Sequence, residues 1–145
     1  MNTSHSGGET LRLEVPATLK YLNVVGACVA GLLAEVEDVA ERDTLSYTVQ
    51  LGIHEICTNI VQHAYAQQQE NNRIAITMEM QTQPRCLCVT LFDTGERFDQ
   101  SAAKDPLLDE GQVHGYGLFL VRNVMDEVTY SRHPDGNCWR LAKNL

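Results

Sequence analysis

The chain has 145 residues, 43% of them hydrophobic, which is enough apolar sequence for one buried core and not for two. The formal net charge is −8 and only 11 residues are lysine or arginine, which argues against a duplex nucleic-acid binder because phosphate contacts need a basic face. The longest apolar stretch, residues 24–34, is well short of the roughly 20 residues that cross a bilayer, so we expect no membrane span.

The N-terminal residues predict a tail followed by a single domain. Residues 1–8 are polar and lack the apolar run of a secretion signal or an anchor. We therefore expect a flexible tail over residues 1–9 and one domain over residues 10–145.

The five cysteines are an odd number and lie in apolar segments, which favours reduced, buried thiols in a cytoplasmic protein. Cys86 and Cys88 have a C-x-C spacing, which differs from the C-x-x-C spacing of common zinc and redox sites. The spacing therefore predicts no metal role for them.

The first half of the domain predicts a strand and two helices. Residues 11–15 alternate between apolar and polar and end at Pro16, as in a short strand. Apolar residues then recur at spacings of three and four over residues 19–36 and again over residues 45–64, which predicts two helices that each bury one face. A polar break at residues 38–43 separates them.

The second half predicts a hairpin, a loop and a third helix. Residues 74–80 and 86–92 form the hairpin around a turn at Gln83 and Pro84. Residues 96–114 contain few apolar side chains and many charges, which is typical of a functional loop. The helix follows over residues 118–124.

The chain closes with a second hairpin, in which Val128 and Tyr130 pair with Trp139 and Leu141 across a turn at residues 134–137. The order of strand, two helices, two strands, helix and two strands suits a sheet with helices packed on one face.

Three segments carry residues suited to chemistry, and the first lies in the second helix. Glu55, Asn59 and His63 recur every four residues and form a polar line beside the apolar face. Packing holds a side chain at this border while it still reaches a cavity, but a solvated helix edge would give the same pattern. The string His54-Glu55 lacks the second histidine of an H-E-x-x-H zinc site, because Thr58 stands there.

The second segment is Asp93-Thr94-Gly95, at the end of an apolar strand. A carboxylate there accepts a hydrogen bond from an exocyclic amine, and a glycine lets a flat ring approach the backbone. An ordinary turn after a strand has the same sequence. Asp-Thr-Gly is also the aspartic-protease triplet, but that chemistry needs a second copy, which the sequence lacks.

The third segment contains Gly115 and Gly117, which open the third helix. Free amides at a helix N-terminus form an anion site, and glycines let phosphate oxygens come close. A flexible hinge before a core helix would use the same residues. The segment matches neither the full Rossmann pattern nor a Walker loop.

The order and spacing of the three segments favour the functional interpretation. The patterns E-x-x-x-N-x-x-x-H-x-Y, D-x-G-x-x-F-D and G-x-G-L-x-L-x-x-x-x-M-D-x-V-x-Y span residues 55–130. In this order they resemble the anti-sigma-factor serine/threonine kinases of the GHKL (Bergerat) ATPase superfamily. The resemblance implies a two-layer α/β sandwich, with a mixed, mostly antiparallel sheet and helices on one face, that binds ATP and magnesium under a short lid of residues 99–114.

The resemblance also implies a role for each matching residue. Asn59 would ligate magnesium through its amide oxygen, and Glu55 would be the general base toward a protein hydroxyl. Asp93 would bind the adenine amino group and Gly95 would line the ring. The residues expected to hold the phosphates open the third helix: Gly115, Tyr116, Gly117, Leu118, Phe119 and Leu120.

Some positions match the pattern without a chemical role, and others depart from it. His63 and Asp126 are expected to be supporting structure. Arg97 replaces a second glycine of the wider superfamily, a departure that the anti-sigma kinases share. Asn137 and Cys138 stand where many members place a phosphate-binding threonine, so the phosphate contacts near the C-terminus stay open.

The implied function is phosphorylation of a serine or threonine on an anti-sigma-factor antagonist, a STAS-domain protein, by a kinase that otherwise holds a sigma factor inactive. We expect a cytoplasmic homodimer without direct nucleic-acid contact. The alternative is a binding module that uses ATP only to order its lid, or a switch kinase without a sigma-factor partner.

Overall fold

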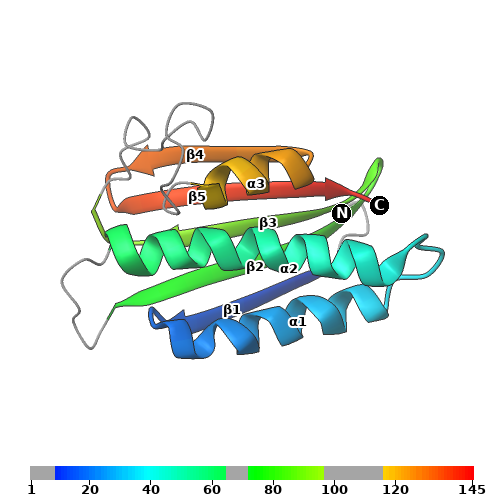
Figure 1. The fold of residues 1–145 in the computed structure, drawn as a ribbon, viewed down its shortest axis with the longest axis horizontal. Helices are drawn as coiled ribbons and strands as arrows, with labels where there is room; N and C mark the ends of the chain where they lie inside the picture. The colour runs from blue at the N-terminus through cyan, green and yellow to red at the C-terminus, as the bar shows by residue number, and fades with distance from the viewer. Residues whose placement is uncertain (1–8, 65–71, 97–115) are drawn as a thin grey trace, which may run out of the picture.

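The computed structural model describes residues 9–64, 72–96 and 116–145, and Figure 1 shows their arrangement. The side chains of His63 and Tyr116 are not described. The predicted lid at residues 99–114 and nearly all of the predicted tail at residues 1–9 lie outside the described residues, as does Gly115.

Five strands form one sheet in the order β1-β2-β3-β5-β4, and every neighbouring pair is antiparallel. In the last hairpin, Val128 pairs with Leu141 and Tyr130 with Trp139, which confirms the predicted register. The strands are β1 (Thr10–Pro16), β2 (Arg73–Thr82), β3 (Arg85–Asp93), β4 (Glu127–His133) and β5 (Gly136–Asn144).

The helices form a second layer on one face of this sheet (Figure 1). They are the short 3-10 helix η1 (Leu19–Tyr21), α1 (Leu22–Ala34), α2 (Arg42–Asn59), the π-helix η2 (Ile60–Ala64) and α3 (Tyr116–Val124). The predicted two-layer α/β fold is confirmed. Within the described residues, no helix is long and apolar enough to cross a membrane.

The core lies between the two layers. Alternation along β2 and β3 directs Ile76 and Leu91 toward the helices, where they are fully buried with Val29 of α1 and Val49 of α2. Trp139 of β5, 1% exposed, is among the largest buried side chains of this core.

The second helix differs from its prediction at the C-terminal end. The apolar spacing predicts one continuous helix over residues 45–64, whereas α2 ends at Asn59 and the next five residues form a π-helix. The pattern does not separate the two because Ile60, Val61 and Ala64 are buried in this geometry as well. Single π turns are frequently found at functional sites, which directs attention to Asn59.

Candidate functional site

Two polar side chains are buried where β3 ends and β5 begins. Asp93 and Asn137 are paired in the ladder, and each is 1% exposed. They are the only polar or charged side chains in the buried class among the described residues. Both follow the alternation of their strands onto the face that the helices cover.

One oxygen of the Asp93 carboxylate is fully engaged and the other is not. Oδ1 accepts hydrogen bonds from the Gly95 amide at 2.9 Å and from Nδ2 of Asn137 at 2.8 Å. Oδ2 is buried and has no hydrogen-bond partner among the described residues. Since an unsatisfied buried acceptor costs free energy, Oδ2 is a natural acceptor for a ligand's N–H group.

The pKa of Asp93 is raised above its ordinary value. Burial of the carboxyl is the largest cause. The hydrogen bonds from Asn137 and Gly95 and the charge of Arg132 act in the opposite direction. The carboxyl is therefore held in an environment that does not fully compensate its charge.

Asn137 fixes the position of Asp93. Its Nδ2 also donates to the Glu96 carbonyl at 2.8 Å, while its Oδ1 accepts from the Tyr130 hydroxyl and from Nη1 of Arg132. The same Arg132 nitrogen donates to the Gly95 carbonyl at 2.8 Å. The sequence patterns identify Asn137 only as a departure from the superfamily pattern. The missed signal is its alternation with Trp139, which places a polar side chain on the buried face.

The turn after Asp93 is packed against the C-terminal end of the π-helix η2. The Glu96 amide donates to the Ala64 carbonyl at 2.8 Å. A Cβ added to Gly95 would lie 2.4 Å from the same carbonyl oxygen. Glycine is thus required here by the approach of the helix end, and the first two predicted segments meet at this point.

The predicted polar line on α2 runs along the edge of the core. Glu55 and Asn59 are both half-buried, and Ile56 between them is fully buried. The Thr58 hydroxyl oxygen is buried without a hydrogen-bond partner among the described residues. Among the described residues, the Thr58 hydroxyl oxygen and Asp93 Oδ2 are the two buried side-chain oxygen or nitrogen atoms without a hydrogen-bond partner. Both lie in segments that the sequence analysis identified as candidates for chemistry.

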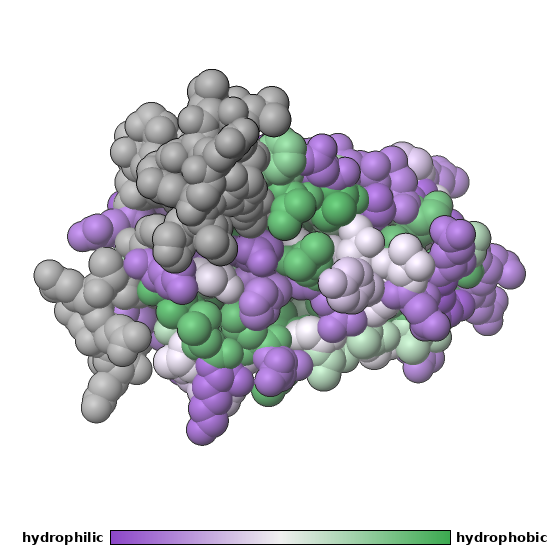
Figure 2. Space-filling view, viewed as in Figure 1, coloured by the Kyte–Doolittle hydropathy of each residue, from purple (hydrophilic) through white to green (hydrophobic). Residues whose placement is uncertain are grey.

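The third predicted segment does open a helix, since α3 begins at Tyr116. Leu118 and Val121 are buried, whereas Phe119 and Leu120 are each 46% exposed. Figure 2 shows apolar surface over this helix. The first amides of α3 have no partner within the helix, as at any helix N-terminus, so they are suited to an anion.

Asp126, after α3, has the supporting role that was expected. Its Oδ2 accepts a hydrogen bond from the Asn144 amide at 2.7 Å and lies 3.8 Å from Nζ of Lys143. These contacts attach the end of α3 to β5.

A hollow of about 250 Å³ lies elsewhere, between α1 and α2. It is lined by Leu22, Asn23, Val25, Gly26, Tyr47, Gln50, Leu51, Ile53, His54 and Cys57. None of the predicted site residues contributes to it, so it is separate from the group formed around Asp93.

Comparison with known proteins assigns a family to this arrangement. Residues 15–143 match the family described as the histidine kinase-like ATPase domain. The chain belongs to this family. The predicted superfamily is thereby confirmed.

Similar proteins include two that are named serine-protein kinase RsbW. The one from Halalkalibacterium halodurans is 31% identical over 137 residues, covering 83% of this chain and 74% of the relative. The one from Staphylococcus aureus is 27% identical over 133 residues, covering 86% of this chain and 80% of the relative.

A solved structure of RsbU and RsbW domains from Mycobacterium tuberculosis has the same fold. Its TM-score is 0.68 at 18% identity, over 94% of this chain. This chain spans 32% of that longer one. The likeness supports the two-layer fold of this family member.

Replacing Gly95 with alanine is expected to destabilise the protein by about 1–3 kcal/mol, because the new Cβ would overlap the Ala64 carbonyl. Urea denaturation monitored by circular dichroism measures this change. The matched control is Gly31→Ala in α1, where a Cβ meets nothing within 4 Å and a gain of roughly 0.5–1 kcal/mol is expected. Equal effects of the two substitutions would contradict the close packing at Gly95.

Proposed function

We propose that the protein is an ATP-dependent serine/threonine protein kinase that acts as an anti-sigma factor. It phosphorylates a STAS-domain antagonist and otherwise sequesters a sigma factor. The names of the two relatives, serine-protein kinase RsbW, support the kinase assignment. The observation that carries the proposal is the buried, unpaired Oδ2 of Asp93 at the end of β3.

Asp93 recognises the base. Its Oδ1 is held by Gly95 and Asn137, so Oδ2 is the oxygen left to accept a hydrogen bond from the adenine amino group. Guanine has a carbonyl oxygen at the corresponding ring position, and two acceptors repel each other. The site therefore selects ATP over GTP.

Asn59 holds magnesium through its side-chain oxygen at the C-terminal end of α2. Magnesium takes hard oxygen ligands and is usually bound through one or two protein groups together with substrate phosphates. In keeping with this, no group of three or more histidine, cysteine, aspartate or glutamate residues suited to a metal exists in the described residues. When bound, the ion would neutralise the phosphate charge, because an acidic protein repels the phosphates at this site.

The opening of α3 binds the phosphates through backbone amides. Residues 116–120 supply these amides at the N-terminal end of the helix, where the dipole also favours an anion. Gly115, the other residue of the predicted segment, lies outside the described residues. Leu118 is buried and anchors this turn to the core.

Glu55 is the general base. It lies one helical turn before Asn59 on the same edge of α2, so the two side chains face the same region. Its carboxylate accepts the proton of the attacking serine or threonine hydroxyl. Asn59 thus binds the metal, and Glu55 accepts the proton.

The partners follow from the same proposal. We expect a homodimer in the cytoplasm that exchanges a sigma factor for the antagonist. An ATP-binding interaction module, or a switch kinase without a sigma partner, is the competing function.

The test incubates the full-length protein with γ-labelled ATP, magnesium and the STAS-domain protein encoded in the same genome. Label on a serine or threonine of that protein, and none with GTP, is the expected result. Tight ATP binding without transfer to any STAS-domain protein of that genome would favour the interaction module. A kinase that captures no sigma factor would favour the switch kinase.

A further inference from the structure

The side-chain amide of Asn137 is fixed in one orientation by its neighbours. Its Oδ1 accepts from Nη1 of Arg132 at 3.2 Å, and its Nδ2 donates to the Glu96 carbonyl at 2.8 Å. Arginine can only donate and a carbonyl can only accept, so turning the amide over would set donor against donor and acceptor against acceptor. Asn137 therefore presents an N–H group to Asp93, and Nδ2 donates to Asp93 Oδ1 at 2.8 Å.

This amide and a backbone group saturate one oxygen of Asp93. A carboxylate oxygen has two lone pairs, and those of Oδ1 accept from Nδ2 of Asn137 and from the Gly95 amide at 2.9 Å. The strands are packed tightly here, because a Cβ added to Gly136 would overlap the Asp93 carbonyl oxygen. Since both donors are held in place, Oδ2 is the oxygen of Asp93 that is open to a ligand.

The purine bases offer different sets of donors to a carboxylate. Adenine has one exocyclic amine beside a ring nitrogen that accepts, so it needs one acceptor oxygen. Guanine has a ring N–H beside its 2-amino group, and two adjacent N–H groups match both oxygens of one carboxylate, as the fork of an arginine does. Hypoxanthine, the base of ITP, has the ring N–H but lacks the 2-amino group. A carboxylate with one free oxygen therefore suits adenine better than guanine.

We propose that Asn137 is a positioning residue that determines base specificity, because it occupies Asp93 Oδ1 and so removes the second acceptor that guanine requires. The inference rests on the proposed function, in which Asp93 binds the base of the nucleotide. A guanine N–H group placed against Oδ1 meets an oxygen that already has two donors, and it is left without a partner in a buried site. Oδ2 repels the guanine carbonyl in one pose of the base, and Oδ1 rejects the paired N–H groups in the other.

Residues on β4 support Asn137 in turn. The Tyr130 hydroxyl also donates to Asn137 Oδ1, and Nη1 of Arg132 also donates to the Gly95 carbonyl at 2.8 Å. Because Tyr130 is half-buried and Arg132 is exposed, water can take the place of the Asn137 oxygen for both. We therefore expect an Asn137→Val protein to fold, with one lone pair of Asp93 Oδ1 released.

The test measures the affinities of ATP, GTP and ITP for the full-length wild type and for Asn137→Val, by calorimetry in the presence of magnesium. The wild type is expected to bind ATP, and to bind GTP and ITP equally weakly, because the 2-amino group finds no free acceptor. In Asn137→Val, the affinity of GTP is expected to rise about tenfold relative to that of ITP. A purely structural role of Asn137 would weaken all three nucleotides by the same factor.

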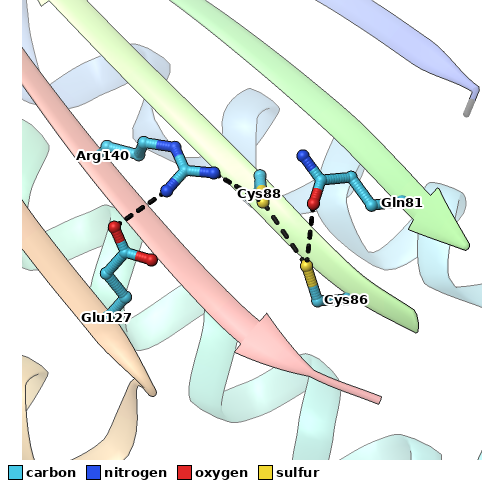
Figure 3. Close-up of polar contacts among 5 residues, drawn as sticks. All are labelled: Gln81, Cys86, Cys88, Glu127 and Arg140. Carbon is cyan, nitrogen blue, oxygen red and sulfur yellow. Dashed lines mark hydrogen bonds and ion pairs between the residues drawn. The ribbon is translucent and has the colours of Figure 1, made fainter. Parts of the chain in front are cut away.

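Arg140→Gln is the matched control. Arg140 lies on the same strand but on the opposite face of the sheet, where its guanidinium binds Glu127 at 2.8 Å and the Cys88 sulfur at 3.3 Å (Figure 3). Its loss removes polar contacts without touching Asp93, so the ratio of GTP to ITP affinity is expected to equal that of the wild type. Circular dichroism of each variant shows whether the fold is retained.

The outcomes separate this inference from the proposed function. A wild type that binds ATP, but also binds GTP more than about tenfold tighter than ITP, would overturn the inference alone. A folded Asn137→Val protein with the wild-type ratio of GTP to ITP affinity would do the same. A wild type that binds no ATP would overturn the proposed function and the inference together.

Discussion

Replacing Glu55 with glutamine is expected to lower the rate of phosphotransfer by about 10³-fold while ATP affinity stays within about twofold. Glutamine keeps the shape and polarity of glutamate but cannot accept the hydroxyl proton at neutral pH. Glu55 is half-buried on α2, one turn before Asn59, so the change leaves the core and the proposed magnesium ligand in place.

Single-turnover transfer of labelled phosphate to the STAS-domain partner measures the first quantity, and calorimetry with ATP measures the second. Glu79→Gln is a suitable control, since Glu79 is also half-buried but lies on β2 opposite Cys88, on the uncovered face of the sheet. A Glu55→Gln protein that transfers phosphate at the wild-type rate would show that another group acts as the base.

Replacing Asp93 with asparagine is expected to weaken ATP binding by about 100-fold or more and to stabilise the ligand-free protein by about 1 kcal/mol. The asparagine oxygen retains the hydrogen bonds from Gly95 and Asn137 that Oδ1 accepts. Its amide nitrogen replaces the buried, unpaired Oδ2, which removes the acceptor for the adenine amino group and also removes the buried charge that the surroundings do not fully compensate. Function and stability therefore change in opposite directions.

The stability gain of the Asp93→Asn variant over the wild type is expected to grow as the pH rises. The pKa of Asp93 is raised in the folded protein above its ordinary value of 3.8, so the folded state favours the protonated carboxyl. The wild-type carboxyl therefore contributes most stability below pH 3.8 and loses it as the pH rises through the folded pKa. Urea denaturation of both proteins across this range measures the difference. An asparagine variant that is less stable at neutral pH would contradict the description of Asp93.

Much of the fold was predictable because its signals are local. The pairing of Tyr130 with Trp139 follows from strand alternation and one turn, and the register confirms it. The helix beginning at Tyr116 follows from the apolar spacing after two glycines. The placement of Asp93 at a strand end could likewise be inferred from its own neighbours in sequence.

The contacts that shape the site could not be predicted, because they join distant segments. Gly95 was interpreted as room for a flat ring, whereas its packing against Ala64 already excludes a side chain. The bonds from Arg132 and Tyr130 to Asn137 depend on the pairing of β4 with β5. The roles of Glu55, Asn59 and the α3 amides stay predictions.

The surroundings of Cys86 and Cys88 also depend on contacts between segments that are distant in sequence. A C-x-C spacing on a strand places two thiols on one face, but only the pairing of β3 with β5 brings an arginine against them. The contact between Arg140 and Cys88 could therefore not be predicted from the spacing alone.

The most direct test of the account is a calorimetric titration with ATP, with and without magnesium, on the wild type, on Asn59→Ala and on Asn23→Ala as an exposed control from α1. We predict magnesium-dependent binding that is retained in the Asn23 variant and lost in the Asn59 variant. No ATP binding by the wild type, or equal magnesium dependence in all three proteins, would contradict the proposed site.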